Sequence, residues 1–294
     1  MPTDTRLHSL VEVQPPPPEE GPARGKDLAE NARPLPARED RCYMTSEKQV
    51  IRLQSAIATA LTPRMTEILR RDAAGETRKA VSEFFELYAK KPILNNKGGS
   101  LFNDSLSLYV TMRLLQPDFI LESGTYRGNS AWLFRQACPQ AAIQTHDVDH
   151  GQLAHRLDDV TYIEGDWADS ALPDFDPRRA VAFFDDHINH ALRLQQAHGR
   201  GIRRALFDDN FPAHNLYATG GQPLPSLAML MDDDLAPGDR FSWVRHGKRY
   251  SYTFETEHAQ GARGLIDRYL PLPDLTAVTR YSPQSGLTYV EILD

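Results

Sequence analysis

The spacing of apolar residues divides the chain into a helical first part and a second part in which short strands alternate with helices. Apolar residues recur every three or four positions from Val50 to Ile68, which predicts a helix with one buried stripe. A second helix is predicted over residues 80–88 and a third over 104–115. We therefore expect a helical region over residues 41–116.

From residue 117 the rhythm changes to short apolar runs separated by stretches with helical spacing. This alternation predicts a mostly parallel sheet that helices cover on both faces. Two further runs, 275–281 and 287–293, are joined by a short turn-like segment, which predicts a closing antiparallel pair. We expect an α/β, doubly wound, Rossmann-like domain over 117–294, with an inserted hairpin near 241–254. The predicted parallel strands are 119–122, 142–147, 160–164, 180–185 and 204–208.

The first forty residues differ in composition from the remainder. They are rich in proline, including Pro15 to Pro18, and lack apolar periodicity, so residues 1–40 are predicted to be a disordered tail. No apolar stretch is long enough to cross a bilayer, and the first residues do not have the pattern of a signal peptide. Two cysteines without paired spacing suit a reducing compartment, so we expect a cytoplasmic protein.

Charge narrows the choice of partners. The formal net charge is −7 and no long Lys/Arg run occurs, which argues against nucleic acid and an anionic membrane as partners. We expect a small-molecule substrate instead. The sequence leaves open whether the protein is a monomer or a homo-oligomer.

The sharpest motif, Leu121-Glu-Ser-Gly-Thr-Tyr-Arg-Gly-Asn-Ser130, follows the first predicted strand and opens a helix. Gly124 permits a tight turn, and Gly128 lies where free backbone N–H groups gather at a helix start. The spacing is not the Gly-x-Gly-x-x-Gly of dinucleotide-binding domains, and no lysine follows as in a P-loop. A ligand-binding turn and an ordinary strand-to-helix turn both remain open.

Acidic residues gather where the predicted strands end, and the carboxyl ends of parallel strands form the ligand crevice of such sheets. Asp147 follows Glu122 by 25 positions, close to the interval of the ribose-binding acid in nucleotide folds. The segment Gly165-Asp166-Trp167 could hold an adenine by hydrogen bonding and stacking. A plain turn with exposed acids is the alternative.

Two later segments, Phe184–His190 and Phe207–Asn210, bring four Asp residues to one predicted sheet edge. Their mutual repulsion must be offset by a cation or by hydrogen bonds, and Asp and Asn oxygens suit Mg²⁺. Helix capping is one alternative. A softer metal held by Asp186, His187 and His190 is another.

The segment Leu121–Ala131 resembles the first motif of class I S-adenosylmethionine-dependent methyltransferases. It is similar especially to the catechol O-methyltransferase, macrocin O-methyltransferase and cephalosporin hydroxylase group. The resemblance spans residues 100–215, and the closing hairpin agrees with it. It implies a seven-stranded sheet, S-adenosylmethionine as cofactor, and methylation of a small-molecule or sugar hydroxyl.

The resemblance also implies roles for individual residues. Asp147 would hold the ribose, Asp166 or Trp167 would lie near the adenine, and His187 would lie beside the cofactor. The residues implied to line the methionine part are Glu122, Gly124, Tyr126, Gly128 and Ser130.

The implied metal site is a Mg²⁺ or similar ion on Asp186, Asp209 and Asn210. Alternation along a strand turns Asp185 and Asp208 to the opposite side, which favours this choice. A bound divalent ion would lower the pKa of the acceptor hydroxyl.

The catechol enzymes carry a lysine base three positions after the first metal-ligand Asp, and here Asn189 stands at that position. We therefore expect His190, with His187 as a second candidate, to take the hydroxyl proton. Two rival functions remain: a module that binds a cofactor or nucleotide without catalysis, and a metal-dependent hydroxylase or hydrolase built on the Asp/His cluster.

Overall fold

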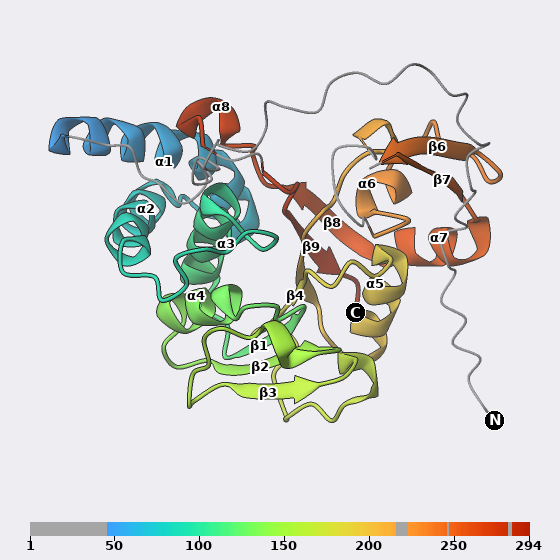
Figure 1. Cartoon of the computed structure of the whole chain (residues 1–294), viewed down its shortest axis with the longest axis horizontal. Helices are drawn as coiled ribbons and strands as arrows, with labels where there is room; N and C mark the ends of the chain where they lie inside the picture. Colours follow the sequence, from blue (N-terminus) through green and yellow to red (C-terminus); the bar gives the residue numbers. More distant parts are fainter. Residues whose placement is uncertain (1–45, 216–222, 246, 282–283) are drawn as a thin grey trace, which may run out of the picture.

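The computed structural model describes residues 46–215, 223–245, 247–281 and 284–294. The predicted disordered tail, residues 1–40, lies outside the described residues. In the described part, seven strands form one sheet in the order β3-β2-β1-β4-β5-β9-β8 (Figure 1). These strands are β1 (Phe119–Ser123), β2 (Ala142–Asp147), β3 (Thr161–Glu164), β4 (Ala180–Phe184), β5 (Arg204–Phe207), β8 (Ile266–Pro271) and β9 (Thr288–Ile292).

Strand direction confirms the predicted fold class. β1 to β5 pair in parallel, whereas β9 runs antiparallel to both of its neighbours, β5 and β8. The chain is therefore an α/β protein with a Rossmann-like, mostly parallel seven-stranded sheet. Insertion of β9 between β5 and β8 distinguishes this sheet from the all-parallel order of nicotinamide-binding domains.

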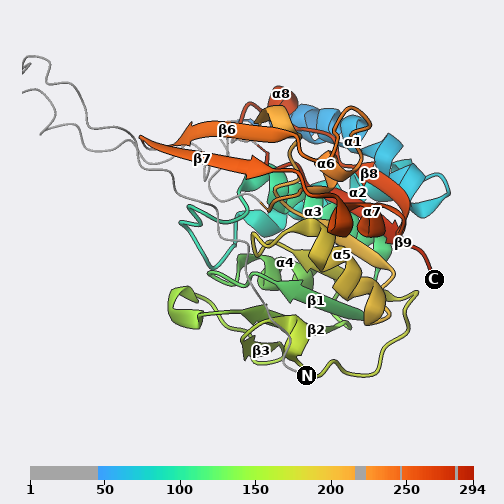
Figure 2. The same cartoon turned by 90° about the vertical axis from the view of Figure 1, so that its right-hand side faces the viewer.

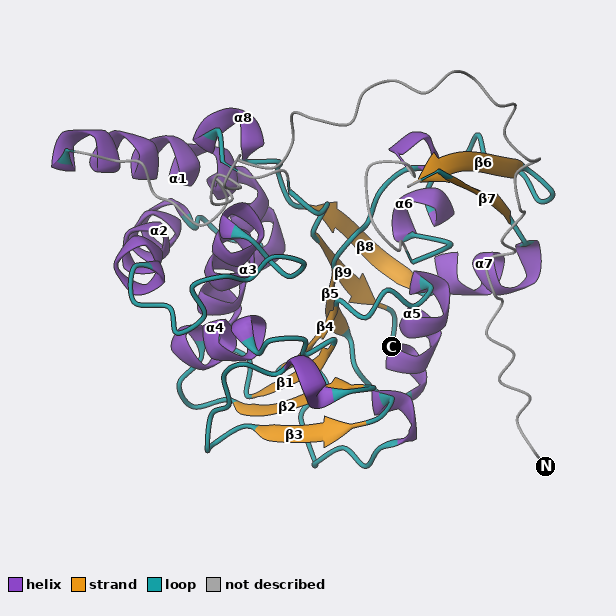
Figure 3. Cartoon of the chain, in the orientation of Figure 1, coloured by secondary structure: helices purple, strands orange, loops and turns teal. Residues whose placement is uncertain are grey.

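Helices cover both faces of the sheet, as Figures 1 and 3 show. One hydrophobic cluster joins a sheet face to α1–α4 and α8, and a second joins the opposite face to α5–α7. The helices are α1 (Glu47–Leu69), α2 (Ala74–Tyr88), α3 (Phe102–Leu115), α4 (Asn129–Ala137), α5 (His190–Gly199), α6 (Leu227–Leu230), α7 (Thr256–Arg263) and α8 (Thr276–Thr279), with short 3₁₀ turns η2 (His150–Gln152), η3 (Trp167–Asp169) and η4 (Ala213–Asn215).

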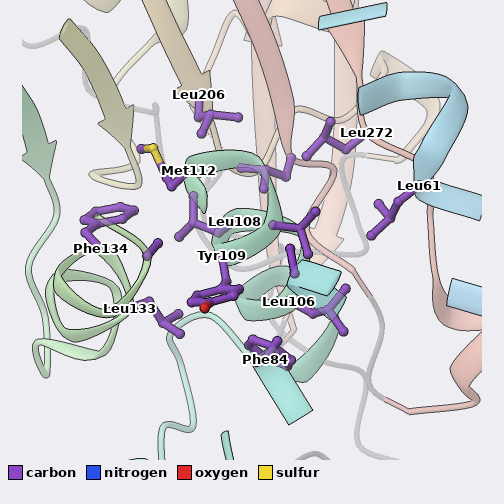
Figure 4. Close-up of a cluster of buried hydrophobic side chains, with 14 of the residues drawn as sticks. Leu61, Phe84, Leu106, Leu108, Tyr109, Met112, Leu133, Phe134, Leu206 and Leu272 are labelled. Carbon is purple, nitrogen blue, oxygen red and sulfur yellow. The ribbon is translucent and has the colours of Figure 1, made fainter. Parts of the chain in front are cut away.

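The alternation of side chains along each strand produces the two clusters. Ile120 and Val181 belong to the cluster under α1–α4, whereas their neighbours Leu121 and Ala182 belong to the cluster under α5–α7. Every residue of β1 and β4 is buried, as expected for central parallel strands. Figure 4 shows the first cluster, in which Leu206 of β5 lies near Met112 and Leu108 of α3.

The N-terminal helices are part of this core. The Ser46 side chain accepts a hydrogen bond from the Gln49 N–H and so caps α1. The predicted stripe is buried from Ile57 to Ile68, and it packs in the first cluster with α2 and α3. Among the residues that the structure describes, no helix is long and apolar enough to cross a membrane.

One predicted strand is wrong. Residues 275–281 do not pair with β9; they form the short helix α8, and β8 is the antiparallel partner of β9. Asp274 accepts a hydrogen bond from the Thr276 N–H, and the Thr279 hydroxyl bonds to the Asn103 side chain on α3. Tertiary contacts of this kind override the strand preference of a Thr/Val-rich run.

An inserted hairpin forms a separate two-stranded sheet of β6 (Arg240–Arg245) and β7 (Lys248–Thr253). The aromatic pairs Phe241–Tyr252 and Trp243–Tyr250 stack across the strands. Figure 2 shows the hairpin extending beyond the body of the molecule.

Because Leu61 is fully buried, Leu61→Ala should lower the free energy of unfolding by about 2–5 kcal/mol. Ile51→Ala on the same helix is the matched control, since Ile51 is mostly exposed, and it should change stability little. Urea denaturation followed by circular dichroism measures both. Equal effects of the two substitutions would contradict the packing of α1 in the first hydrophobic cluster.

Candidate functional site

A cavity of about 320 Å³ opens where β1 to β4 end. Its position at the carboxyl edge of the parallel strands is where doubly wound sheets bind ligands. It is lined by Gly98, Gly99, Ser123, Gly124, Tyr126, His146, Asp147, Val148, Gly165, Asp166, Asp185, Asp186, His187, Ile188 and Arg193.

The turn after β1 forms one wall, and only glycine fits at its first position. Gly124 has φ +103°, and a Cβ there would collide with the backbone carbonyl of Asp185. The Gly124 N–H also donates to the carbonyl of His146 at 2.8 Å. The turn is thereby held between the ends of β4 and β2.

Asp147 reaches the cavity from the end of β2, as the sequence predicts for a ribose-binding acid. Its Oδ2 accepts a hydrogen bond from the Tyr126 N–H at 2.8 Å, and its Oδ1 accepts a longer one from the Asp149 N–H at 3.3 Å. These bonds orient the carboxylate and leave lone pairs for a ligand.

The loop before α3 also contributes to the cavity, which the sequence analysis missed. Gly98 and Gly99 line it, and the Tyr126 hydroxyl donates to the carbonyl of Lys97 at 2.9 Å. The run Asn95-Asn-Lys-Gly-Gly99 carried a loop signal but nothing that pointed to this site.

Three residues expected to touch the cofactor lie behind the wall instead. Glu122, Gly128 and Ser130 are not among the lining residues. Glu122 is fully buried and accepts hydrogen bonds from the hydroxyls of Thr145 and Ser130. A Cβ on Gly128 would collide with the carbonyl of His155, so this glycine is needed for chain packing.

A buried ion-pair network forms the opposite wall. Arg193 of α5 donates to Asp166 Oδ1 at 2.8 Å and to Asp186 Oδ2 at 2.7 Å. Asp186 also accepts from the hydroxyl of Ser123. Sequence reasoning missed Arg193, whose only signal was a cation on the apolar face of a predicted helix.

Trp167 is not an adenine platform. Its side chain is fully buried, packs against Phe184 with ring centroids 5.6 Å apart, and does not line the cavity. Asp166 does line it, and its Oδ1 caps η3 by accepting from the Ala168 N–H.

His187 lies at the edge of the cavity with a half-exposed side chain. Its Nε2 lies 3.3 Å from Asp209 Oδ2 and 3.9 Å from Asp185 Oδ1. His187 and Asp209 both have positive φ, at 58° and 50°, because the chain turns sharply at the ends of β4 and β5. These turns bring residues from two strands together beside the cavity.

Three carboxyl groups gather next to His187. Burial raises the pKa values of Asp185 and Asp208 above the usual range, and it raises that of Asp209 to about 8. Repulsion from neighbouring carboxylates adds to the rise at Asp185 and Asp209. The Ser285 hydroxyl bonds to Asp208 and also to Asp104, whose pKa burial raises to about 7. Among the described residues, the His187 imidazole is the basic group that lies beside these carboxyl groups. Protons on the carboxyl groups are the other means of reducing the negative charge.

The structure does not bring the expected metal ligands together. Asp186 is paired with Arg193, and the Asn210 amide bonds to Tyr269, Thr288 and the N–H of Ala228. Within the described ranges, no group of three or more His, Cys, Asp or Glu side chains is arranged to hold a metal ion.

His190 is a core residue and not an accessible base. Its imidazole is buried, accepts the Leu227 N–H at Nδ1 and lies against Phe207. Burial lowers its pKa to about 3, which is far from that of an effective base at neutral pH. Of the two histidines expected to take the hydroxyl proton, His187 is the one that lines the cavity.

Comparison with known proteins gives the following. No family model matches the chain, and no curated protein matches it. Among solved structures, a methyltransferase of Podospora anserina, PaMTH1, bound to S-adenosylhomocysteine is similar at 19% identity and TM-score 0.39, over 73% of this chain and 88% of that one. CmcI with Mg and S-adenosylmethionine is similar at 15% identity and TM-score 0.40, over 69% and 74%.

A third similar structure is the sugar N-methyltransferase KedS8 from a Streptoalloteichus species, at 15% identity and TM-score 0.38, over 71% of this chain and 93% of that one. At this level of identity and overlap the likenesses carry no argument about activity.

Burial raises the pKa of Glu122 to about 7, whereas an unfolded Glu titrates near 4.3. Between these values the folded chain keeps a proton that the unfolded chain has lost, so the free energy of unfolding should fall as pH rises. Glu122→Gln removes this loss, and from pH 4.5 to 8 its stability relative to wild type should rise by up to about 3 kcal/mol.

Urea denaturation at several pH values measures the difference. Glu86→Gln on the exposed surface of α2 is the control, and its difference from wild type should not change with pH. A parallel pH dependence of wild type and Glu122→Gln would show that Glu122 titrates normally.

Proposed function

We propose that this chain is an S-adenosylmethionine-dependent methyltransferase that methylates a hydroxyl group of a small-molecule acceptor. One observation carries the proposal: a single cavity is lined both by Asp147, whose carboxylate suits ribose hydroxyls, and by His187, whose ring lies against Asp209 and suits receipt of a proton. The sequence motif around Gly124 supports the same cofactor.

The residues present fit the cofactor. The cavity volume of about 320 Å³ lies within the range of small-molecule sites. The Gly124 turn keeps the wall free of a side chain, and Asp147 offers acceptor atoms. Ser123 and Tyr126 complete the same end of the cavity. S-adenosylmethionine, when bound, supplies a methyl group on a positively charged sulfur.

The proposed chemistry of the chain's own residues is proton removal. His187 is half-exposed at the cavity edge, so an acceptor hydroxyl can approach its ring. Asp209 lies against Nε2, where its Oδ2 can accept the ring hydrogen and so fix the tautomer that leaves Nδ1 free. The hydroxyl proton would go to His187 Nδ1 as the oxygen gains the methyl group.

A divalent cation is a separate proposal for this edge. The oxygens of Asp185, Asp208 and Asp209 are of the type that Mg²⁺ prefers. Burial raises the pKa values of these groups, and a cation would offset the cost of burying them in the charged form. They are not arranged as a ready site in the described part of the chain. No step above therefore depends on a metal.

Asp147→Ala should weaken binding of S-adenosylhomocysteine about ten-fold or more, because hydrogen bonds to a charged group are worth roughly 1.5–3 kcal/mol. Isothermal titration calorimetry measures the affinity. Asp149→Ala is the matched control, since this nearby exposed acid does not line the cavity. Unchanged affinity in folded Asp147→Ala would place the ribose elsewhere.

Asp209→Asn should lower methyl transfer by roughly 10²-fold while leaving the affinity for S-adenosylhomocysteine unchanged, since Asp209 pairs with His187 and does not line the cavity. Transfer from labelled S-adenosylmethionine to a panel of phenols, catechols and sugars provides the measurement. Asp174→Asn in the exposed loop before β4 should retain activity.

The same assay with EDTA separates the two mechanisms. Activity that survives EDTA supports proton removal by His187. Loss of activity that Mg²⁺ restores supports the cation proposal. Binding without transfer to any acceptor would favour the non-catalytic module, and metal binding without cofactor binding would favour the hydrolase or hydroxylase alternative.

A further inference from the structure

His146 is a buried histidine that lines the cavity and has no part in the function proposed above. It lies at the end of β2, directly before Asp147, and only 1% of its surface is exposed. Asp166 and Arg193, which also line the cavity, are close enough to influence its ring. His146 is thus part of the cavity lining where β2 and β3 end.

The neighbours of His146 determine which ring nitrogen carries the hydrogen. Gln144 Nε2 lies 2.9 Å from His146 Nε2 and 3.1 Å from the carbonyl oxygen of Ala171. A carbonyl oxygen can only accept, so the Gln144 amide must present its NH₂ group there. The same NH₂ group donates to His146 Nε2, which leaves the hydrogen on Nδ1 of the neutral ring.

The ring is neutral at neutral pH because burial lowers the pKa of His146 to about 4. Its Nδ1 is buried and has no hydrogen-bond partner among the residues that the structure describes. An N–H group left in this state costs free energy, and most buried polar groups in proteins are paired. Because His146 lines the cavity, a ligand bound there is the candidate partner.

The buried His190 shows what a histidine with a purely structural role looks like here. Its Nδ1 accepts from the Leu227 N–H, its ring also bonds to the backbone of Asp208, and it does not line the cavity. His146 differs in both respects. His146 therefore combines a buried nitrogen that has no partner among the described residues with a place in the cavity lining.

We propose that His146 binds the cofactor by donating its Nδ1 hydrogen to a ring nitrogen of the adenine. This inference rests on the proposed function, which puts the ribose at Asp147, and on the sequence-based expectation that the adenine lies near Gly165 and Asp166, which line the same cavity. The adenine ring nitrogens N1, N3 and N7 are hydrogen-bond acceptors. A single N–H donor fixed by Gln144 would select for one of them.

Deletion of ligand atoms tests the proposal. Isothermal titration compares S-adenosylhomocysteine with its 1-deaza, 3-deaza and 7-deaza analogues, each of which lacks one ring nitrogen. In wild type, one analogue should bind roughly ten-fold more weakly than S-adenosylhomocysteine, the usual scale of one hydrogen bond. In His146→Phe that difference should vanish, because the donor is gone.

A structural role alone would not make the penalty depend on one ligand atom. His155→Phe, a histidine outside the cavity lining, is the control and should keep the wild-type pattern. The proposal is overturned if no analogue is penalised in wild type, or if the penalty persists in His146→Phe. Failure of wild type to bind S-adenosylhomocysteine at all would instead remove the proposed function.

Nitrogen NMR of the wild-type protein, with its histidines labelled, tests the proposal without any substitution. Nδ1 of His146 should be the protonated nitrogen, and its resonance should move more than that of Nε2 when S-adenosylhomocysteine binds. Protonation at Nε2, or a Nδ1 signal that does not respond to the ligand, would overturn the proposal.

Discussion

The shape of the cavity depends on the ion pairs that the buried guanidinium of Arg193 makes. It pairs with Asp166 after β3 and with Asp186 after β4, so one cation joins two loops that separate strands deliver. Removing one partner of a buried ion pair is strongly destabilising, because the remaining charge is left uncompensated. Arg193 therefore lets a wall of the cavity contain two carboxylates that line it without repelling each other.

On the other side of the same sheet edge, the described residues supply no such guanidinium. Asp185, Asp208 and Asp209 are buried together, and protons or His187 must balance their charge. This asymmetry separates two tasks. The side neutralised by Arg193 is suited to hold a ligand rigidly, whereas the side whose carboxyl groups have raised pKa values is suited to exchange protons.

The sequence predicted the sheet and the acid-rich edge because strand periodicity and the acids that end each strand are local signals. It expected Asp185 to face away from the ligand crevice and Asp186 to hold a metal, whereas Asp185 lines the cavity and Asp186 pairs with Arg193. The alternation rule was extended past Phe184 and Phe207, where the strands already end and the chain turns. Arg193 and His146 were missed because each is a single residue whose role arises only from contacts distant in sequence.

The geometry at His187 and Asp209 could not be predicted because the site violates local conformational preferences there. His187 and Asp209 adopt positive φ, a conformation that costs non-glycine residues of order 1 kcal/mol or more. Buried carboxyl groups add to this cost. Such a cost is tolerated only where the surrounding fold determines the conformation, and here the two hydrophobic clusters on either face of the sheet do so. Because local propensity favours other conformations at these positions, it cannot predict the geometry that brings His187 to Asp209.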